Sequence, residues 1–117
     1  MFYPARTTRV YIAPGATDMR KAINSLSLLV MDHLGLDPLS GHLFAFCNRK
    51  RDMIKVLYWD SNGFCLWHKR LEKGRFMWPE DIDEALAIEG YQLAWLLDGL
   101  TLDQPSAHRH LEYEIMA

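Results

Sequence analysis

The chain has 117 residues, half of them hydrophobic and 12% aromatic, and its formal net charge is −2. This length suits one domain with a single core, and the composition excludes an intrinsically disordered protein. No apolar run reaches the roughly 18 residues of a membrane-spanning helix, and residues 1–10 lack a secretion signal, so a cytoplasmic protein is expected.

The first predicted elements are a short strand and a long helix. Residues 10–13 are β-prone and stop at a Pro-Gly pair, which predicts a strand. An amphipathic helix follows, with Thr17 or Asp18 as its N-cap, apolar positions every three or four residues up to Leu34, and Gly35 as its end. This helix should pack on one face of a sheet and bury Ile23, Leu26 and Val30.

After a turn at 37–41, aromatic and β-branched residues predict extended structure. The connections between the extended runs are too short for parallel crossovers, so the strands should form an antiparallel meander. Asn62 and Gly63 suit the positive φ of the central hairpin turn, and Gly74 suits the next turn. The predicted strands are 43–48, 54–59, 64–70 and a shorter fourth strand, 75–78.

The C-terminal third predicts a possible strand over 85–88 and a short helix around residues 93–97 that ends at Gly99. The fold class is therefore α+β: an antiparallel β-meander sheet with one main N-terminal helix packed on it and a short C-terminal helix. One domain should span residues 1–100, followed by a frayed tail over 101–117.

Charge is distributed unevenly along the chain. Residues 42–78 hold eight Lys or Arg and three acids, whereas residues 79–117 hold one cation and nine acids. In a meander, alternate turns lie at the same end of the sheet, so the loop 49–51 should lie near the turn at Lys73, with the Asn62–Gly63 turn opposite. The candidate nucleic-acid-binding residues are therefore Arg49, Lys50, Arg51, Lys69, Arg70, Lys73 and Arg75.

Other sites have weaker support. Cys65 and His68 form a C-x-x-H pattern, but on a strand they point to opposite faces, so no metal site is expected. Cys47 and Cys65 should lie about two strand spacings apart, roughly 10 Å, which is too far for a disulfide. The aromatic residues between the cations are interpreted as core, with a stacking platform for single-stranded nucleic acid as the alternative.

No catalytic motif is recognisable. A DNA-cutting enzyme would need several carboxylates that hold paired metal ions, and the acids here cluster in the C-terminal third without such a pattern. Gly-rich phosphate loops and nucleophile elbows are also absent from the sequence. A non-enzymatic protein without a cofactor is therefore expected.

Several blocks in order along the chain resemble TnpB, the accessory protein of the insertion-sequence-66 family of bacterial mobile elements. They are GATDMRK at 15–21, DPLSGHLF at 37–44, KVLYWD at 55–60, much of 63–79, and LAWLLDG at 93–99. The chain departs from the family pattern at Ala22, Cys47 and His68, of which Cys47 replaces a common arginine. The resemblance implies a role in transposition beside a separate, larger transposase, and it carries no catalytic residues with it.

Three functions remain open at this point. The leading hypothesis is an accessory protein that contacts element DNA through its basic middle segment. The second is an adaptor that binds the element-encoded transposase through its acidic C-terminal region or an exposed Trp95, without DNA contact. The third and least favoured is a metal-dependent nuclease.

Overall fold

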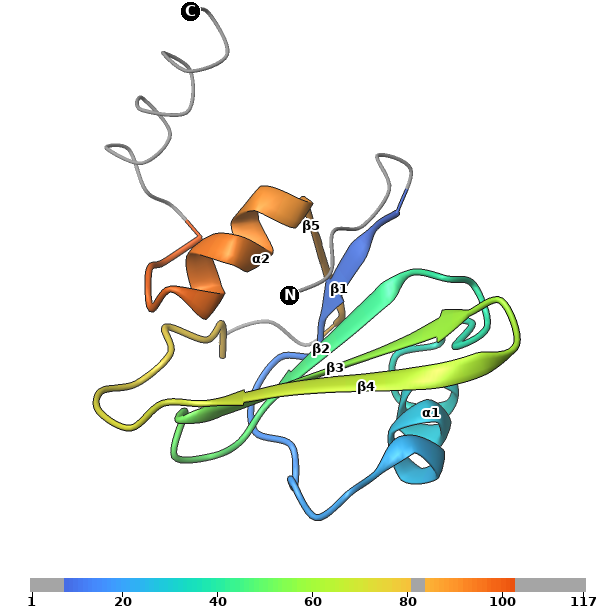
Figure 1. Ribbon diagram of the computed structural model, residues 1–117, viewed down its shortest axis with the longest axis horizontal. Helices are drawn as coiled ribbons and strands as arrows, with labels where there is room; N and C mark the ends of the chain where they lie inside the picture. The colour runs from blue at the N-terminus through green and yellow to red at the C-terminus, as the bar shows by residue number, and fades with distance from the viewer. Residues whose placement is uncertain (1–7, 81–83, 103–117) are drawn as a thin grey trace, which may run out of the picture.

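The computed structural model describes residues 8–80 and 84–102, which form a five-stranded sheet with one helix on each face (Figure 1). This confirms the α+β class. In chain order the elements are β1 (Val10–Ile12), α1 (Ile23–Asp32), β2 (Leu43–Cys47), β3 (Met53–Asp60), β4 (Gly63–Arg70), β5 (Leu86–Ile88) and α2 (Gly90–Leu97).

The sheet is mixed rather than purely antiparallel, which corrects the prediction. Its strand order is β4-β3-β2-β1-β5, and the β2-β3-β4 part is the expected antiparallel meander. However, β1 pairs with β2 in parallel, and β5 pairs with β1 antiparallel. The parallel pair is possible because the connection from β1 to β2 contains α1 and is long enough to return the chain to the starting end of the sheet.

Each face of the sheet has its own apolar core. On the α1 face, side chains of β2 and β3 pack against Leu26 and Val30, which are fully buried as predicted, while Ile23 is half-buried against the same cluster. On the α2 face, alternate residues of the same strands point the other way, as the two-residue period of a strand requires. The buried members of that second cluster include Val10, Ile12, Ala45, Cys47, Ile54, Val56, Phe76, Trp78, Leu93 and Leu96.

Helix α1 begins later than predicted. Its N-cap is Ala22, without a side-chain cap. Thr17 is buried and its backbone N–H donates to the Cys47 carbonyl at 2.7 Å, while Asp18 accepts the backbone N–H of Arg20 at 2.9 Å and closes a tight turn. The capping signal was real, but it stabilises a turn in the loop between β1 and α1, because local side-chain hydrogen bonds compete with helix formation.

Residues 75–78 are not a strand, which is a second correction. After β4 the chain crosses the end of the sheet, and the Phe76 N–H donates to the Arg51 carbonyl at 2.6 Å. Phe76 and Trp78 are both buried on the α2 face, and the Trp78 indole N–H donates to the Ala13 carbonyl at 2.8 Å. Their alternation resembles that of a strand because both aromatic rings are inserted on the same side.

The remaining expectations are mostly confirmed. β5 and α2 occupy the predicted positions, and α2 carries a capping box between Glu89 and Gln92. Gly74 adopts a positive φ of 80°, but in the central hairpin the positive φ falls on Ser61 and not on Asn62 or Gly63. The expected tail lies outside the described residues from position 103 onward. No described helix is long and apolar enough to cross a membrane.

The two cysteines lie far apart. Cys47 is opposite Ile54 on β3, whereas Cys65 is opposite Tyr58, four residues further along β3 and on the outer strand β4. This register separates them by more than the 7 Å or less that a disulfide allows between Cα atoms. Cys65 and Trp67 face α2, so His68, which follows Trp67 on the strand, points to the other face.

Burial should make the two thiols react at different rates. Burial raises the pKa of the Cys47 thiol to about 12, and the thiolate is the reactive form, so Cys47 stays protonated near pH 8. Cys65 is only half-buried. We expect a thiol reagent at pH 8 to modify Cys65 more than tenfold faster than Cys47 in the folded protein, with the difference lost in urea. Equal rates in the folded protein, read by mass spectrometry, would contradict the packing of Cys47.

Candidate nucleic-acid interface

The structure brings the β2–β3 loop, residues 48–52, beside the segment that leaves β4. Met53 is opposite Arg70 in the β3–β4 ladder, and the Leu71 N–H donates to the Asp52 carbonyl at 2.7 Å. The Asp60–Gly63 pairing closes the other hairpin at the opposite end. The predicted juxtaposition is confirmed, and we name residues 48–52 and 70–75 together the basic end.

Asn48 organises the tip of the basic end. Its side-chain oxygen accepts the backbone N–H groups of Asp52 and Met53 at 3.0 and 3.1 Å, and its amide nitrogen donates to the Asp52 carboxylate at 2.6 Å. Arg51 takes a left-handed φ of 60° to close the loop. These bonds leave the intervening residues Arg49 and Lys50 fully on the surface.

The cations of the basic end differ in how far they are neutralised. Arg51 forms an ion pair with Glu80 and its side chain is 28% exposed, while Arg70 lies 3.7 Å from the Glu72 carboxylate. The other four are exposed, and no carboxylate among residues 8–80 and 84–102 lies within ion-pair distance of them. These four are Arg49, Lys50, Lys73 and Arg75.

Lys69 lies apart from the other predicted residues. It follows His68 on β4, and its side chain points to the α2 face, where its ammonium group donates to the Leu97 carbonyl at 2.9 Å. Leu97 is the last residue of α2, so this cation lies at the negative end of the helix dipole. Lys69 therefore joins α2 to the sheet and does not extend the cluster formed by the other six.

The structure also shows a role of Lys55 that the sequence reasoning missed. The Lys55 ammonium group donates to the carbonyls of Met19 and Lys21 at 2.8 and 3.1 Å, and this holds the loop before α1 against the same end of the sheet. This loop carries Arg20 and Lys21, and Lys21 lines a cavity along α1 together with Asp32 and His33. Arg20 is paired with Asp18, whose pKa is lowered to about 2 by the hydrogen bonds from the Arg20 side chain.

Comparison with known proteins places the chain in a family. Residues 8–107 match the model of the IS66 Orf2 like protein family. The chain belongs to the IS66 Orf2-like family. It is 44% identical over 105 residues to the uncharacterized protein y4hO of Sinorhizobium fredii, covering 90% of this chain and 91% of that protein. The uncharacterized protein y4jC of the same organism is 35% identical over 100 residues, covering 86% of each. No solved structure gives a significant match.

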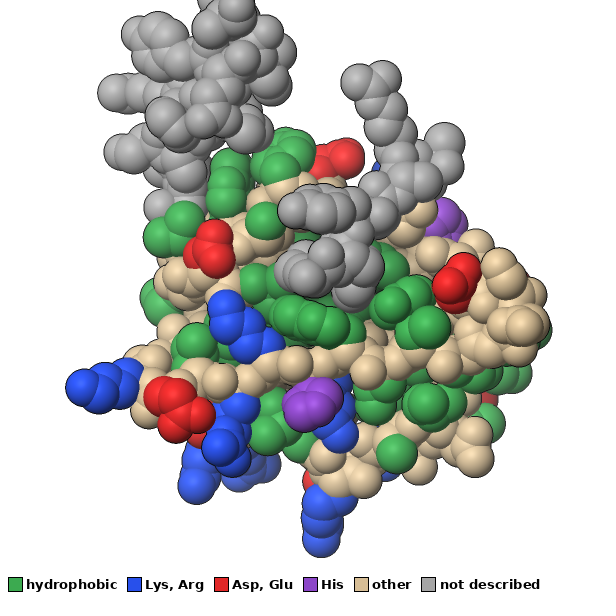
Figure 2. Space-filling view, viewed as in Figure 1, with side chains coloured by type: hydrophobic (Ala, Val, Ile, Leu, Met, Phe, Trp, Pro, Cys, Tyr) green, Lys and Arg blue, Asp and Glu red, His purple; other side chains and the backbone are tan. Residues whose placement is uncertain are grey.

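The IS66 Orf2-like family is linked to transposition of this class of insertion element, so the chain has an accessory role in transposition. The match confirms the resemblance seen in the sequence and covers all the elements of the structure. Lys and Arg side chains gather at the lower left of the molecule, over the end where β4 and the loop after it lie (Figure 2). Exposed arginine and lysine on such an end can contact phosphate groups without reading base sequence.

Proposed function

We propose that this IS66 Orf2-like protein contacts element DNA through the basic end, as a non-enzymatic accessory component of transposition in the bacterial cytoplasm. The observation that carries the proposal is the group of four exposed cations on two segments joined by backbone hydrogen bonds, none of them paired with a carboxylate of the described residues. Phosphate contacts by lysine and arginine supply most of the affinity of sequence-independent DNA binding. The other three cations of the candidate set contribute less, because each already has a partner.

The proposal assigns no catalytic step to the chain. Across the described residues, no three His, Cys, Asp or Glu side chains are grouped so that they could hold a metal ion. Cys65 and His68 face opposite sides of β4. In this proposal, DNA cleavage belongs to the separate transposase that the family resemblance implies.

The second candidate function is a protein adaptor that binds the element-encoded transposase. The sequence suggested Trp95 for this role, but Trp95 is half-buried and makes an edge-to-face contact with Tyr91, with ring centroids 5.1 Å apart. A groove beside α1, described below, favours a protein partner more strongly than Trp95 does.

A salt titration tests the DNA proposal. Labelled duplexes of the element end and of unrelated sequence would be titrated with purified protein at several salt concentrations, with anisotropy as the readout. We expect binding to both duplexes, and a linear fall of log affinity with log salt whose slope is about −0.9 per phosphate contact. If the protein binds neither duplex at low salt, the proposal is overturned and the adaptor function is favoured.

A further inference from the structure

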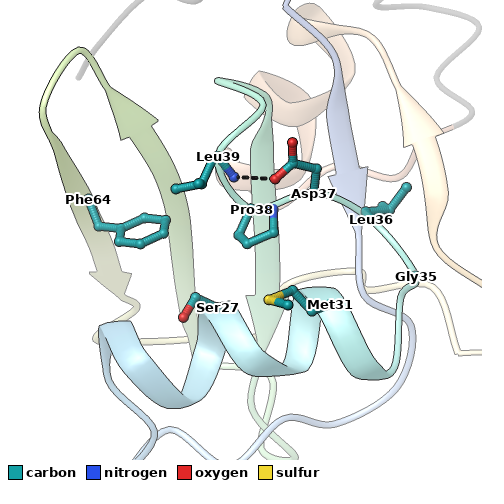
Figure 3. A pocket seen from close by; sticks show the side chains of 8 residues that line it. All are labelled: Ser27, Met31, Gly35, Leu36, Asp37, Pro38, Leu39 and Phe64. Atoms are coloured by element: carbon teal, nitrogen blue, oxygen red, sulfur yellow. Dashed lines mark hydrogen bonds between the residues drawn. The ribbon is translucent and has the colours of Figure 1, made fainter.

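An apolar cavity of about 670 Å³ lies between α1 and the loop that follows it. Met31 and Ser27 on α1 point toward it from one side, and Pro38, Leu39 and Phe64 line the other side (Figure 3). Met31 and Leu39 are 53% and 54% exposed, although both are large apolar side chains. Contiguous exposed apolar surface of this kind marks an interaction site more often than an unused surface.

A second cavity of about 460 Å³ adjoins the first and shares Gly35 and Leu36 with it. Its lining includes the acids Asp32 and Glu84 but no Lys or Arg. We name the two cavities together the acidic groove. The groove is thus apolar in one half and acidic in the other.

The carboxylates that line the acidic groove are Asp32, Asp37 and Glu84, and no Lys or Arg lines it. Residues 22–48 contain no Lys or Arg, and neither do residues 56–67. Asp37 lines the apolar half, and one of its oxygens accepts the Leu39 N–H at 2.9 Å. The nearest cations are Arg9, two residues before Tyr11 of the lining, and Lys21, which lines a neighbouring cavity together with Asp32. An anionic segment would be repelled here, whereas a cationic one would be attracted.

We propose that the acidic groove binds a segment of a partner protein that carries a large apolar side chain next to lysine or arginine. The apolar side chain would fill the cavity between Met31, Leu39 and Phe64, and the cations would lie beside Asp32 and Glu84. Charge complementarity selects this occupant over the same face of a second copy, because two acidic grooves would repel each other. The inference does not depend on DNA binding, because no residue of the basic end lines the acidic groove.

Two labelled synthetic peptides test this proposal. They share the same leucine and phenylalanine positions, and differ only in that one has lysine and the other glutamate at the flanking positions. We expect the lysine peptide to bind the full chain at least about tenfold more tightly than the glutamate peptide, as measured by anisotropy. A lysine peptide with serine in place of the apolar residues should also bind at least about tenfold more weakly.

Matched variants locate the binding. Met31→Glu should weaken binding of the lysine peptide by at least about tenfold. Leu28→Glu should not, because Leu28 is equally exposed on the same helix, at 56%, but does not line the acidic groove. A double Asp32→Asn, Glu84→Gln variant should bind the lysine and glutamate peptides with more similar affinities than the wild type does. Both glutamate variants should retain the DNA binding of the wild type, which separates this test from that of the proposed function.

Three results would overturn the inference. They are absence of saturable binding of the lysine peptide, equal binding of the two peptides, and equal losses for Met31→Glu and Leu28→Glu. Sedimentation of the wild type gives a further check. Self-association that Met31→Glu abolishes, without peptide binding, would assign the acidic groove to a second copy of the chain instead.

Discussion

Trp78→Ala should lower the free energy of unfolding by about 3–5 kcal/mol, the range for removing a large buried aromatic side chain. Trp78 is 4% exposed and fills the α2 face of the sheet, although it belongs to no helix or strand. Its indole N–H also donates a buried hydrogen bond to the Ala13 carbonyl, and the variant loses that bond. Urea denaturation followed by circular dichroism measures the loss directly.

The neighbouring residue supplies the control for this prediction. Met77 is 49% exposed, so Met77→Ala should change the free energy of unfolding by less than about 0.5 kcal/mol. Trp78→Phe keeps an aromatic ring but removes the hydrogen bond. It should lower the free energy of unfolding by an intermediate amount, about 1–3 kcal/mol. Similar losses for Met77→Ala and Trp78→Ala would show that residues 75–78 do not pack as described.

Replacing Arg49, Lys50, Lys73 and Arg75 together by alanine should remove most of the affinity for DNA. Each lost phosphate contact reduces the magnitude of the salt slope by about 0.9. The variant should lose up to about four such contacts, one for each cation removed. Near 0.1 M salt this corresponds to a fall in affinity of roughly a hundredfold or more. The loss should be the same for element-end and unrelated duplexes, because phosphate contacts carry no sequence information.

Lys69→Ala is the matched control for that variant. Its ammonium group is bound to the Leu97 carbonyl on the α2 face, so its removal should leave the salt slope unchanged and cost some stability instead. Thermal unfolding of both variants shows whether each remains folded. If the quadruple alanine variant is folded and keeps the wild-type salt slope, the basic end does not contact DNA.

The meander and the α1 face could be predicted because their signals are local. Strand alternation, short connections and a helical apolar stripe all lie within a few residues of one another. The parallel partner of β1 could not be predicted, because pairing between β1 and β2 depends on where the chain returns after α1. The strand prediction for residues 75–78 was wrong for a related reason. Phe76 and Trp78 alternate as strand residues do, but the backbone of this segment lies outside the sheet.

The candidate site, too, could be predicted where its signals are local and not where it depends on distant contacts. The meander alone placed the loop 49–51 beside the residues after β4, since alternate hairpin ends coincide. The strand period also separates Lys69 from Arg70, although the sequence reasoning grouped them. The anchoring of the loop before α1 could not be inferred, because it depends on Lys55, a half-buried strand residue whose ammonium group reaches carbonyls more than 30 positions earlier.

The basic end and the acidic groove share no residue, so the two proposed occupants use separate parts of the surface. With the two proposals taken together, one copy of this small domain holds a nucleic acid and a protein segment at the same time. Tethering of this kind converts a bimolecular encounter into an intramolecular one, with effective concentrations in the millimolar range for short spans. In that proposed arrangement, a weak contact at each of the two surfaces concentrates the partner protein on the DNA.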